Sequence, residues 1–220
     1  SVNLSKQGNP SMWFSYEVII DNLYAKFKDM GATTDALLLY APKQMTTGNL
    51  EWVEDKIKEG LKKYSTKFIF IDHIDFLTPK NVRNNEQLRI VLKEVCTQLK
   101  TIAINLKVTI FLIAHVKKVQ GRAVEMQDVG ESSGIYQLSD MVFLVTRNNQ
   151  PKEINGIKTD VFGDYSTIRV LKNRVTGEIT SIDYDVKDNL IIPHIPNSSL
   201  IQKEKHEFES PLWQPGDDNN

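Results

Sequence analysis

The 220-residue sequence predicts an α/β fold with a mostly parallel, twisted sheet flanked by helices and an antiparallel edge near the C-terminus. Two observations lead to this fold class. Continuous apolar runs at 68–71 and 108–114 show no polar alternation, which is typical of strands buried on both faces of a parallel sheet. Amphipathic helical patterns separate the runs, and strands that alternate with helices indicate a doubly wound sheet.

The elements of the N-terminal half follow from their patterns. Residues 12–17 form an apolar run that ends in an acid, after a turn at 8–10, and predict a strand. Apolar residues at helical spacing predict three helices, and apolar runs predict three further strands. The predicted helices span residues 19–30, 49–64 and 81–107, and the predicted strands span 36–40, 68–71 and 108–114.

The pattern changes after residue 115. Residues 116–127 are polar and basic and residues 128–134 are small, so both stretches are predicted to be loops. A short helix is expected around residues 136–138, and a polar hairpin is expected at 148–164. Strands are predicted at 141–145, 166–172 and 178–184. The expected organisation is one domain at 1–192 and a flexible acidic tail at 193–220.

Composition excludes several classes of protein. With 40% hydrophobic and 25% charged residues the chain is of ordinary globular type. No apolar stretch approaches the ~20 residues of a membrane span, and no secretion signal is present, so a cytoplasmic protein without membrane contact is expected. The lone Cys96 is predicted to be a core residue. The net charge of −1 permits nucleic-acid binding at a local basic cluster without requiring it.

Three predicted strands end in polar side chains, namely Glu17, Asp72 and His115. The carboxyl ends of parallel strands meet at one edge, where α/β proteins bind ligands. Asp72 there can hold a hydrated Mg²⁺ against nucleotide phosphates, Glu17 can act as a general base on water, and His115 can sense a terminal phosphate. Taken singly, each residue could equally be a cap or a hydrogen-bonded structural group; together they favour a nucleotide-driven machine.

Five segments, in order, resemble the RecA-like P-loop NTPase motor domain of hexameric replicative DNA helicases. The resemblance is to the DnaB type, closest to the phage primase-helicase and Twinkle branch, and covers about residues 1–190. The segments are 14–17, 70–73, 113–117, 128–140 and 171–177. The resemblance implies ATP-driven (or dTTP-driven) translocation on single-stranded DNA, with Mg²⁺ as cofactor. It also implies a ring-shaped homo-oligomer, expected to be a hexamer, with primase as a further candidate partner, in a bacterial or phage-infected cell.

The resemblance assigns roles to individual residues. Glu17 matches the catalytic glutamate, Asp72 the Walker B metal-associated aspartate, and His115 the γ-phosphate sensor. Lys172 and Arg174 match residues that reach the nucleotide of a neighbouring subunit. Arg147 and Tyr184 fall where the phage branch sandwiches the nucleotide base.

DNA contacts are expected from two adjoining loops. The segment 128–140 resembles the family's central DNA-binding loop and the helix after it, although Gly130 stands where relatives usually carry a basic residue. Basic side chains before it can hold phosphates without reading sequence; a solvated loop is the alternative. The predicted DNA-binding residues are Lys117, Lys118, Arg122, Gly130, Ser132, Ser133 and Gly134.

The sequence departs from the family in one major respect. It contains no Gly-x-x-x-x-Gly-Lys-Ser/Thr phosphate loop, which would cradle the nucleotide phosphates. In the family that loop lies just upstream of a helix. Residues 1–7 resemble the C-terminal end of this helix. A truncated chain, a split protein and a degenerate ATPase all explain this, and the start at Ser1 favours the first. The isolated chain is expected to hydrolyse ATP weakly or not at all, and its sheet to lack a central strand.

Two other readings of function remain open. A RecA or RadA type recombinase core shares the sheet, Glu17 and Asp72, but does not predict the 172–177 segment. A non-catalytic fragment that contributes only to assembly would explain the missing phosphate loop.

Overall fold

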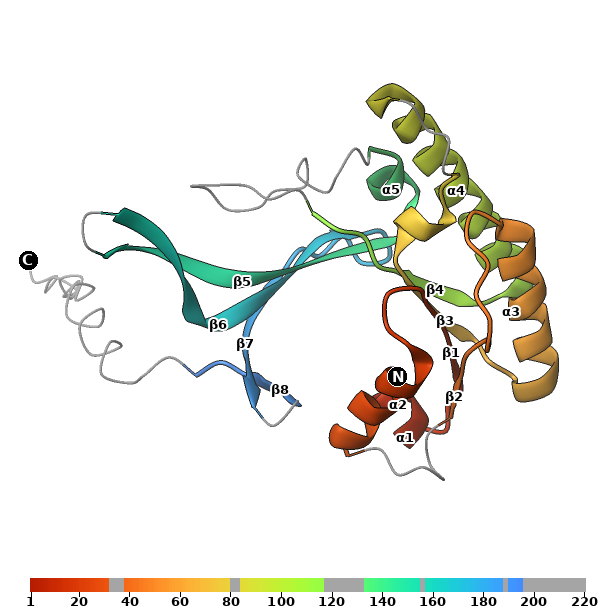
Figure 1. Ribbon diagram of the computed structural model, residues 1–220, viewed down its shortest axis with the longest axis horizontal. Helices are drawn as coiled ribbons and strands as arrows, with labels where there is room; N and C mark the ends of the chain where they lie inside the picture. The colour runs from red at the N-terminus through yellow and green to blue at the C-terminus, as the bar shows by residue number, and fades with distance from the viewer. Residues whose placement is uncertain (32–37, 80–83, 117–132, 155–156, 188–189, 196–220) are drawn as a thin grey trace, which may run out of the picture.

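The computed structural model describes residues 1–31, 38–79, 84–116, 133–154, 157–187 and 190–195, arranged as Figure 1 shows. A parallel sheet packed with helices forms one part of the molecule, and an antiparallel sheet extends away from it. The predicted α/β fold class is confirmed, with one difference. The antiparallel strands form a second hydrogen-bonded sheet, whereas an antiparallel edge of a single sheet was expected.

The parallel sheet has four strands in the order β2-β1-β3-β4. The strands are β1 (Ser11–Ser15), β2 (Leu39–Tyr40), β3 (Phe68–Asp72) and β4 (Thr109–Leu112). Each neighbouring pair is parallel, and Ser15 stands opposite Asp72 in the register of β1 and β3. The four strands predicted for this half of the chain therefore exist, with ends shifted by a few residues.

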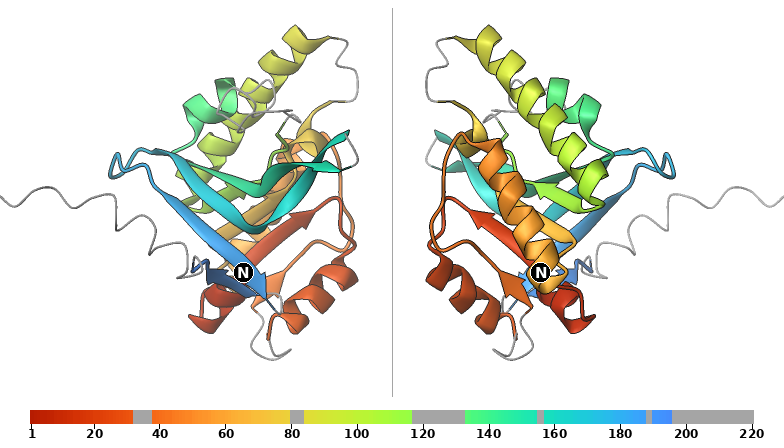
Figure 2. Two further views of the ribbon diagram at one scale, coloured as in Figure 1. Left: turned by 90° about the vertical axis from the view of Figure 1, so that its left-hand side faces the viewer. Right: turned by 90° about the vertical axis from the view of Figure 1, so that its right-hand side faces the viewer.

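Side-chain alternation along the strands builds two cores. Met12 and Phe14 of β1 are buried against α3 (Leu50–Tyr64) and α4 (Asn85–Leu106) on one face. On the other face the ring centroids of Trp13 and Phe70 lie 4.7 Å apart, and those of Phe70 and Phe111 lie 4.6 Å apart. Helices α1 (Val2–Lys6) and α2 (Ile20–Asp29) supply a smaller core there. The sheet thus lies between two helical layers (Figure 2).

Asparagine caps set the starts of the two long helices. The Asn49 side chain accepts a hydrogen bond from the backbone N–H of Trp52 at 2.9 Å, and α3 begins at the next residue. Asn84 accepts one from Gln87 N–H at 2.9 Å, so α4 begins at residue 85, later than the predicted residue 81. Such caps satisfy backbone donors that have no partner inside the helix.

The helical layers also bear on two sequence-based expectations. Cys96 is buried, and this burial raises the pKa of its thiol to about 11, which confirms it as a core residue. None of the described helices combines the length and the apolar character that a bilayer span needs.

The antiparallel sheet has the order β5-β6-β7-β8. Its strands are β5 (Met141–Ile154), β6 (Ile157–Asn173), β7 (Ser181–Lys187) and β8 (Leu190–Pro193). The polar hairpin predicted at 148–164 is confirmed as the outer half of β5 and β6, which reaches far from the helical part (Figure 1). A short helix, α5 (Ser133–Leu138), precedes this sheet as expected.

Strand β8 was missed by the sequence analysis. The flexible tail was predicted to begin at residue 193, but Pro193 is part of β8 and pairs with Tyr184. The next residue, His194, lies with its Nδ1 3.0 Å from both carboxylate oxygens of Asp185 and stacks on Tyr165. The prediction for residues 196–220 lies outside the described residues.

Strand β4 forms the open edge of the parallel sheet. Among the described residues it pairs only with β3, and no ladder joins it to β5. Phe111 and Ile113 at this edge are 39% and 38% exposed although they belong to a strongly apolar run. The expectation of a missing central strand stays a prediction, and β4 is the edge at which a further strand could pair.

The fold offers one direct test of its packing. The Thr66 hydroxyl is fully buried and has no hydrogen-bond partner among the described residues. Thr66→Val keeps the shape and removes the unpaired group, so the melting temperature should rise by about 2–4 °C, or ~1 kcal/mol. Thermal unfolding measures this, with Thr101→Val as a control because the Thr101 hydroxyl donates to Thr97 O at 2.9 Å. An unchanged or lower melting temperature for Thr66→Val contradicts the packing.

Candidate functional site

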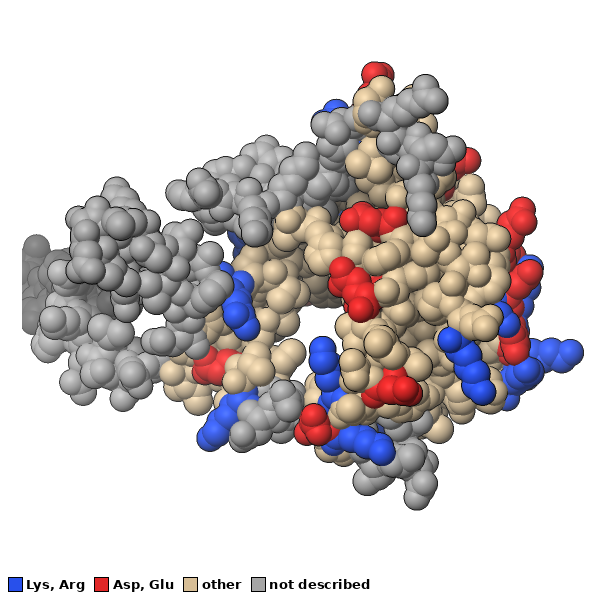
Figure 3. Space-filling view, in the orientation of Figure 1, with Lys and Arg blue, Asp and Glu red and all other residues tan. Residues whose placement is uncertain are grey.

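The carboxyl edge of the parallel sheet brings together the polar residues expected there. The β1–β3 ladder continues past Ser15, because Tyr16 N–H donates to Asp72 O at 2.9 Å, which places Glu17 beside the end of β3. Glu17 Oε1 lies 3.5 Å from His115 Nε2, beyond the end of β4. In Figure 3 acidic side chains lie on the side of the molecule's helical part that faces the antiparallel sheet, with basic side chains near them.

A fourth residue of the edge, His73, was missed as a site residue. Its Nε2 lies 3.1 Å from Glu17 Oε1, and its ring meets the His115 ring edge to face with centroids 4.3 Å apart. Consecutive residues of a strand point to opposite faces of the sheet. The sequence alone therefore gives no reason to expect His73, which directly follows Asp72, in the same cluster. His73 is the buried member of this group, and its peptide bond to Asp72 is cis.

Electrostatics at the edge disfavour the ionised form of Asp72. Desolvation raises the pKa of its carboxyl, and the Glu17 charge raises it further, while His73, His115 and Lys26 oppose the shift. Two carboxylates beside each other offer the oxygen ligands that Mg²⁺ prefers. Asp72 and Glu17 therefore fit the expected cation, since bound positive charge would offset both the burial and the mutual repulsion.

Asp72→Asn is expected to raise the melting temperature near neutral pH when divalent ions are absent. The pKa of Asp72 is higher in the folded chain than its ordinary value of 3.8, so stability is lost as the pH rises through the folded pKa. The variant does not ionise and escapes this loss. The difference should vanish below about pH 3.8.

Thermal unfolding in EDTA between acid and neutral pH measures this difference. Adding Mg²⁺ should then stabilise the native chain more than the variant, because only the native residue offers a carboxylate. A variant that is less stable than the native chain at neutral pH in EDTA contradicts the assigned environment of Asp72.

Lys172 and Arg174 meet at the end of helix α5. Lys172 Nζ donates to the carbonyl of Tyr136 at 2.5 Å, and Arg174 Nη2 donates to the carbonyl of Gln137 at 2.5 Å. Arg174 also lies 3.7 Å from Asp140, which contacts Lys100 of α4. Cations at a helix C-terminus satisfy its last carbonyls. Partial desolvation lowers the pKa of Lys172, and the Arg174 charge adds to this shift.

Arg147 and Tyr184 stand in one row across the antiparallel sheet. Arg147 of β5 pairs with Ser166 of β6, and Ser166 pairs with Tyr184 of β7. Directly paired residues share a face of a sheet, so the two flank Ser166 on the same face. Tyr184 is buried and Arg147 is exposed. Their role in holding a base stays a prediction.

The predicted DNA contacts fall mostly on residues outside the described part of the chain. Lys117, Lys118, Arg122, Gly130 and Ser132 belong to this group. Ser133 is the first residue of α5. Gly134 is buried, and a Cβ there would lie 3.0 Å from Cα and Cβ of Lys93, so this glycine allows α5 to pack closely on α4. Its expected DNA contact stays a prediction.

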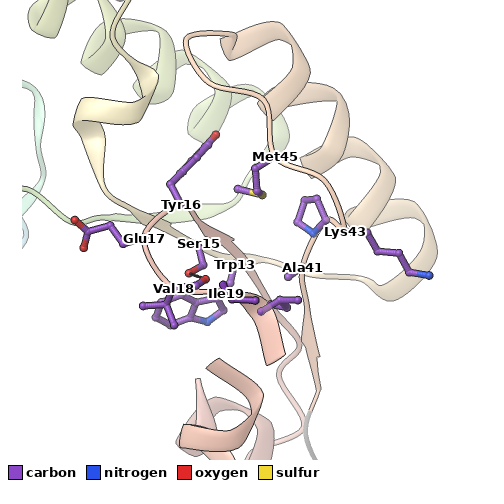
Figure 4. A pocket seen from close by; sticks show the side chains of 11 residues that line it. Trp13, Ser15, Tyr16, Glu17, Val18, Ile19, Ala41, Lys43 and Met45 are labelled. Atoms are coloured by element: carbon purple, nitrogen blue, oxygen red, sulfur yellow. Dashed lines mark hydrogen bonds between the residues drawn. The ribbon is translucent and has the colours of Figure 1, made fainter. Parts of the chain in front are cut away.

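A pocket of ≈ 260 Å³ opens beside the site, between the ends of β1 and β2 and the start of α2. Trp13, Ala41 and Met45 are among the residues that line it, and so is Glu17. Figure 4 shows the Glu17 carboxylate turned away from these three side chains. The pocket therefore shares Glu17 with the polar cluster, whereas Asp72, His73 and His115 are not part of its lining.

Comparisons with known proteins agree with this architecture. The model of the DnaB-like helicase C-terminal domain family matches residues 21–191. A DNA helicase/primase of Enterobacteria phage T3 is 29% identical over 117 residues, which are 50% of this chain and 19% of that protein. A solved structure of a DnaB-like replicative helicase, described with its interactions with primase, matches with a TM-score of 0.66 and 13% identity. That match covers 87% of this chain and 52% of the other. The chain thus spans about a fifth of the phage relative and about half of the solved relative.

Proposed function

Because the chain belongs to the DnaB-like helicase C-terminal domain family, we propose that it is the motor of an ATP-dependent replicative DNA helicase. Nucleotide hydrolysis would drive translocation on single-stranded DNA and separation of the duplex. The observation that carries this proposal is the convergence of Glu17, Asp72 and His115 at the carboxyl edge of the parallel sheet. Phosphoryl transfer depends on positioning and charge, which is what such a group of side chains can supply.

Each residue of the edge has a part in the proposed reaction. Glu17 orients a water and accepts its proton. His73, 3.1 Å away, holds the Glu17 carboxylate in place when Nε2 carries the hydrogen. His115 approaches the same oxygen at 3.5 Å, so a change in its contact with the terminal phosphate would reach Glu17 directly. Asp72 and Glu17 would hold Mg²⁺, which neutralises charge on the phosphate oxygens when bound.

Lys172 and Arg174 would act on the nucleotide of a neighbouring subunit. Within their own chain they hold the last carbonyls of α5, the helix that follows the predicted DNA-binding loop. A pull on Arg174 by a neighbour's nucleotide would therefore be transmitted to α5 and on to DNA. This connection gives a physical route from hydrolysis to movement of DNA.

The proposed assembly follows from these roles. A residue that acts across a subunit boundary requires an oligomer, and a homohexameric ring is proposed, with primase as a further partner. ATP or dTTP would be the nucleotide, with its base between Arg147 and Tyr184. The T3 relative, named a DNA helicase/primase, supports a place in the cytoplasm of a bacterial or phage-infected cell.

The test compares ATP hydrolysis by these 220 residues with hydrolysis by the product of the complete reading frame. The 220 residues contain no phosphate loop, so they are expected to hydrolyse ATP weakly or not at all. The complete product should hydrolyse ATP faster when single-stranded DNA is added, and should unwind a forked duplex as a ring. Strand exchange by open filaments would favour the recombinase reading, and no nucleotide binding in either protein would overturn the proposal.

A further inference from the structure

The donor atoms at the carboxyl edge suit a second kind of metal ion besides Mg²⁺. Glu17, His73 and His115 each offer one ligand atom, and these three atoms all lie within 4.8 Å of one another. Two imidazole nitrogens and one carboxylate oxygen are ligands for Zn²⁺ and related transition ions, whereas Mg²⁺ takes oxygen ligands. We propose that Glu17, His73 and His115 form an inhibitory binding site for a Zn²⁺-class ion.

The spacing of the three side chains is close to that of a bound ion. Glu17 Oε1 lies 3.1 Å from His73 Nε2 and 3.5 Å from His115 Nε2. Two ligand atoms at ~2.1 Å from a tetrahedral zinc stand roughly 3.4 Å apart. Two of the three distances between ligand atoms are therefore already close to the required length. A small rotation of the more exposed His115 would bring its Nε2 to the required distance from His73 Nε2. The fourth position on the ion would be left for water.

The surroundings hold the inner ligand and leave the outer ones accessible. The His73 side chain is only 8% exposed, and its other nitrogen, Nδ1, lies 3.4 Å from both the backbone N–H and the carboxylate Oδ2 of Asp75. Binding of an ion at Nε2 places the hydrogen on Nδ1, where the Asp75 carboxylate can accept it. A carboxylate on the far nitrogen is the usual arrangement that orients a metal-binding histidine. The Glu17 and His115 side chains are 42% and 61% exposed, so an ion can enter from solvent. The site is thus anchored on one side and open on the other.

Occupation would block the proposed reaction. The ion would take the Glu17 oxygen that is proposed to receive the proton from water, and the His115 nitrogen that is proposed to sense the phosphate. This inhibitory consequence rests on the proposed function, whereas binding of the ion does not. The two parts can therefore fail separately.

Cobalt is the probe for binding, because tetrahedral Co²⁺ with nitrogen ligands absorbs visible light strongly and takes the place of Zn²⁺. Titration of the 220-residue protein with Co²⁺ should give a visible absorption band that saturates at one ion per chain. Zn²⁺ should abolish this band, and a large excess of Mg²⁺ should not. Glu17→Gln, His73→Gln and His115→Gln should each weaken Co²⁺ binding by at least ~10-fold, and Asp75→Asn by about 10–100-fold. Thermal unfolding checks that each variant is folded.

The matched control removes the other two histidines of the chain. Since the sequence has four histidines, the double variant His194→Gln/His206→Gln keeps only the two histidines of the proposed site. It should retain the cobalt band and its affinity. A band that is lost in this control, that is displaced by Mg²⁺, or that survives in His73→Gln overturns the site. If the band behaves as expected but stoichiometric Zn²⁺ leaves ATP hydrolysis by the complete protein unchanged, inhibition is refuted; if that protein hydrolyses no ATP at all, the proposed function fails and the site stands.

Discussion

Replacing Glu17 with glutamine is expected to lower ATP hydrolysis by the complete protein about 10²–10⁴-fold while ATP binding changes little. Glutamine keeps the length of the side chain and can still accept a hydrogen bond from His73, which lies 3.1 Å from the Glu17 oxygen. It cannot take a proton from water. The chemical step should therefore fail while the shape of the site is kept.

Single-turnover hydrolysis and nucleotide binding measure the two effects separately. Glu51→Gln is the matched control, because Glu51 is an exposed acid in the first turn of α3. Its hydrolysis rate should equal that of the native protein. If Glu17→Gln slows hydrolysis less than tenfold, or loses ATP binding in proportion, the role of Glu17 as general base is wrong.

Arg174→Ala should have a comparable or larger effect, about 10³–10⁵-fold in hydrolysis, because an arginine supplied across a subunit boundary stabilises charge on the transferring phosphoryl group. Arg174→Lys should recover little, since an ammonium lacks the planar fork of a guanidinium. Arg89→Ala, at an exposed position on α4, serves as the control for loss of a surface arginine. Thermal unfolding must accompany the assay because Arg174 also holds the Gln137 carbonyl.

Mixing two inactive variants decides whether Arg174 acts in trans. An interface at which an Arg174→Ala subunit supplies Glu17 and a Glu17→Gln subunit supplies Arg174 contains both groups. Random mixing gives about a quarter of such interfaces in a cyclic ring. Activity should therefore reappear on mixing. If the mixture is as inactive as its components, Arg174 and Glu17 act on the nucleotide of the same subunit.

The sequence predicts the parallel half of the molecule well because burial leaves a clear pattern there. Apolar runs that end in Glu17, Asp72 and His115 indicate both the strands and the edge at which they meet. His73 escapes prediction because its place depends on how the chain turns after β3. This turn is held by contacts distant in sequence, including the hydrogen bond from Ile74 N–H to Ile113 O.

In the antiparallel half the hairpin was predicted, but strand β8 and the long-range contacts were not. Strands β5 and β6 continue through polar residues. Their length is therefore set by backbone hydrogen bonding and cannot be read from hydrophobic periodicity. The contacts of Lys172 and Arg174 with α5 join residues about 35 positions apart, which no local pattern reveals. Their proposed role concerns another subunit, whereas the structure shows a contact within their own chain.

The open edge of β4 affects how the protein behaves in the test tube. A strongly apolar strand with an unpaired edge is a template for pairing with the same strand of another molecule. Phe111 and Ile113 add exposed apolar surface at that edge. Concentrated samples of these 220 residues will therefore tend to aggregate through β4, and a peptide or chain segment that pairs with this edge would act as a solubilising agent.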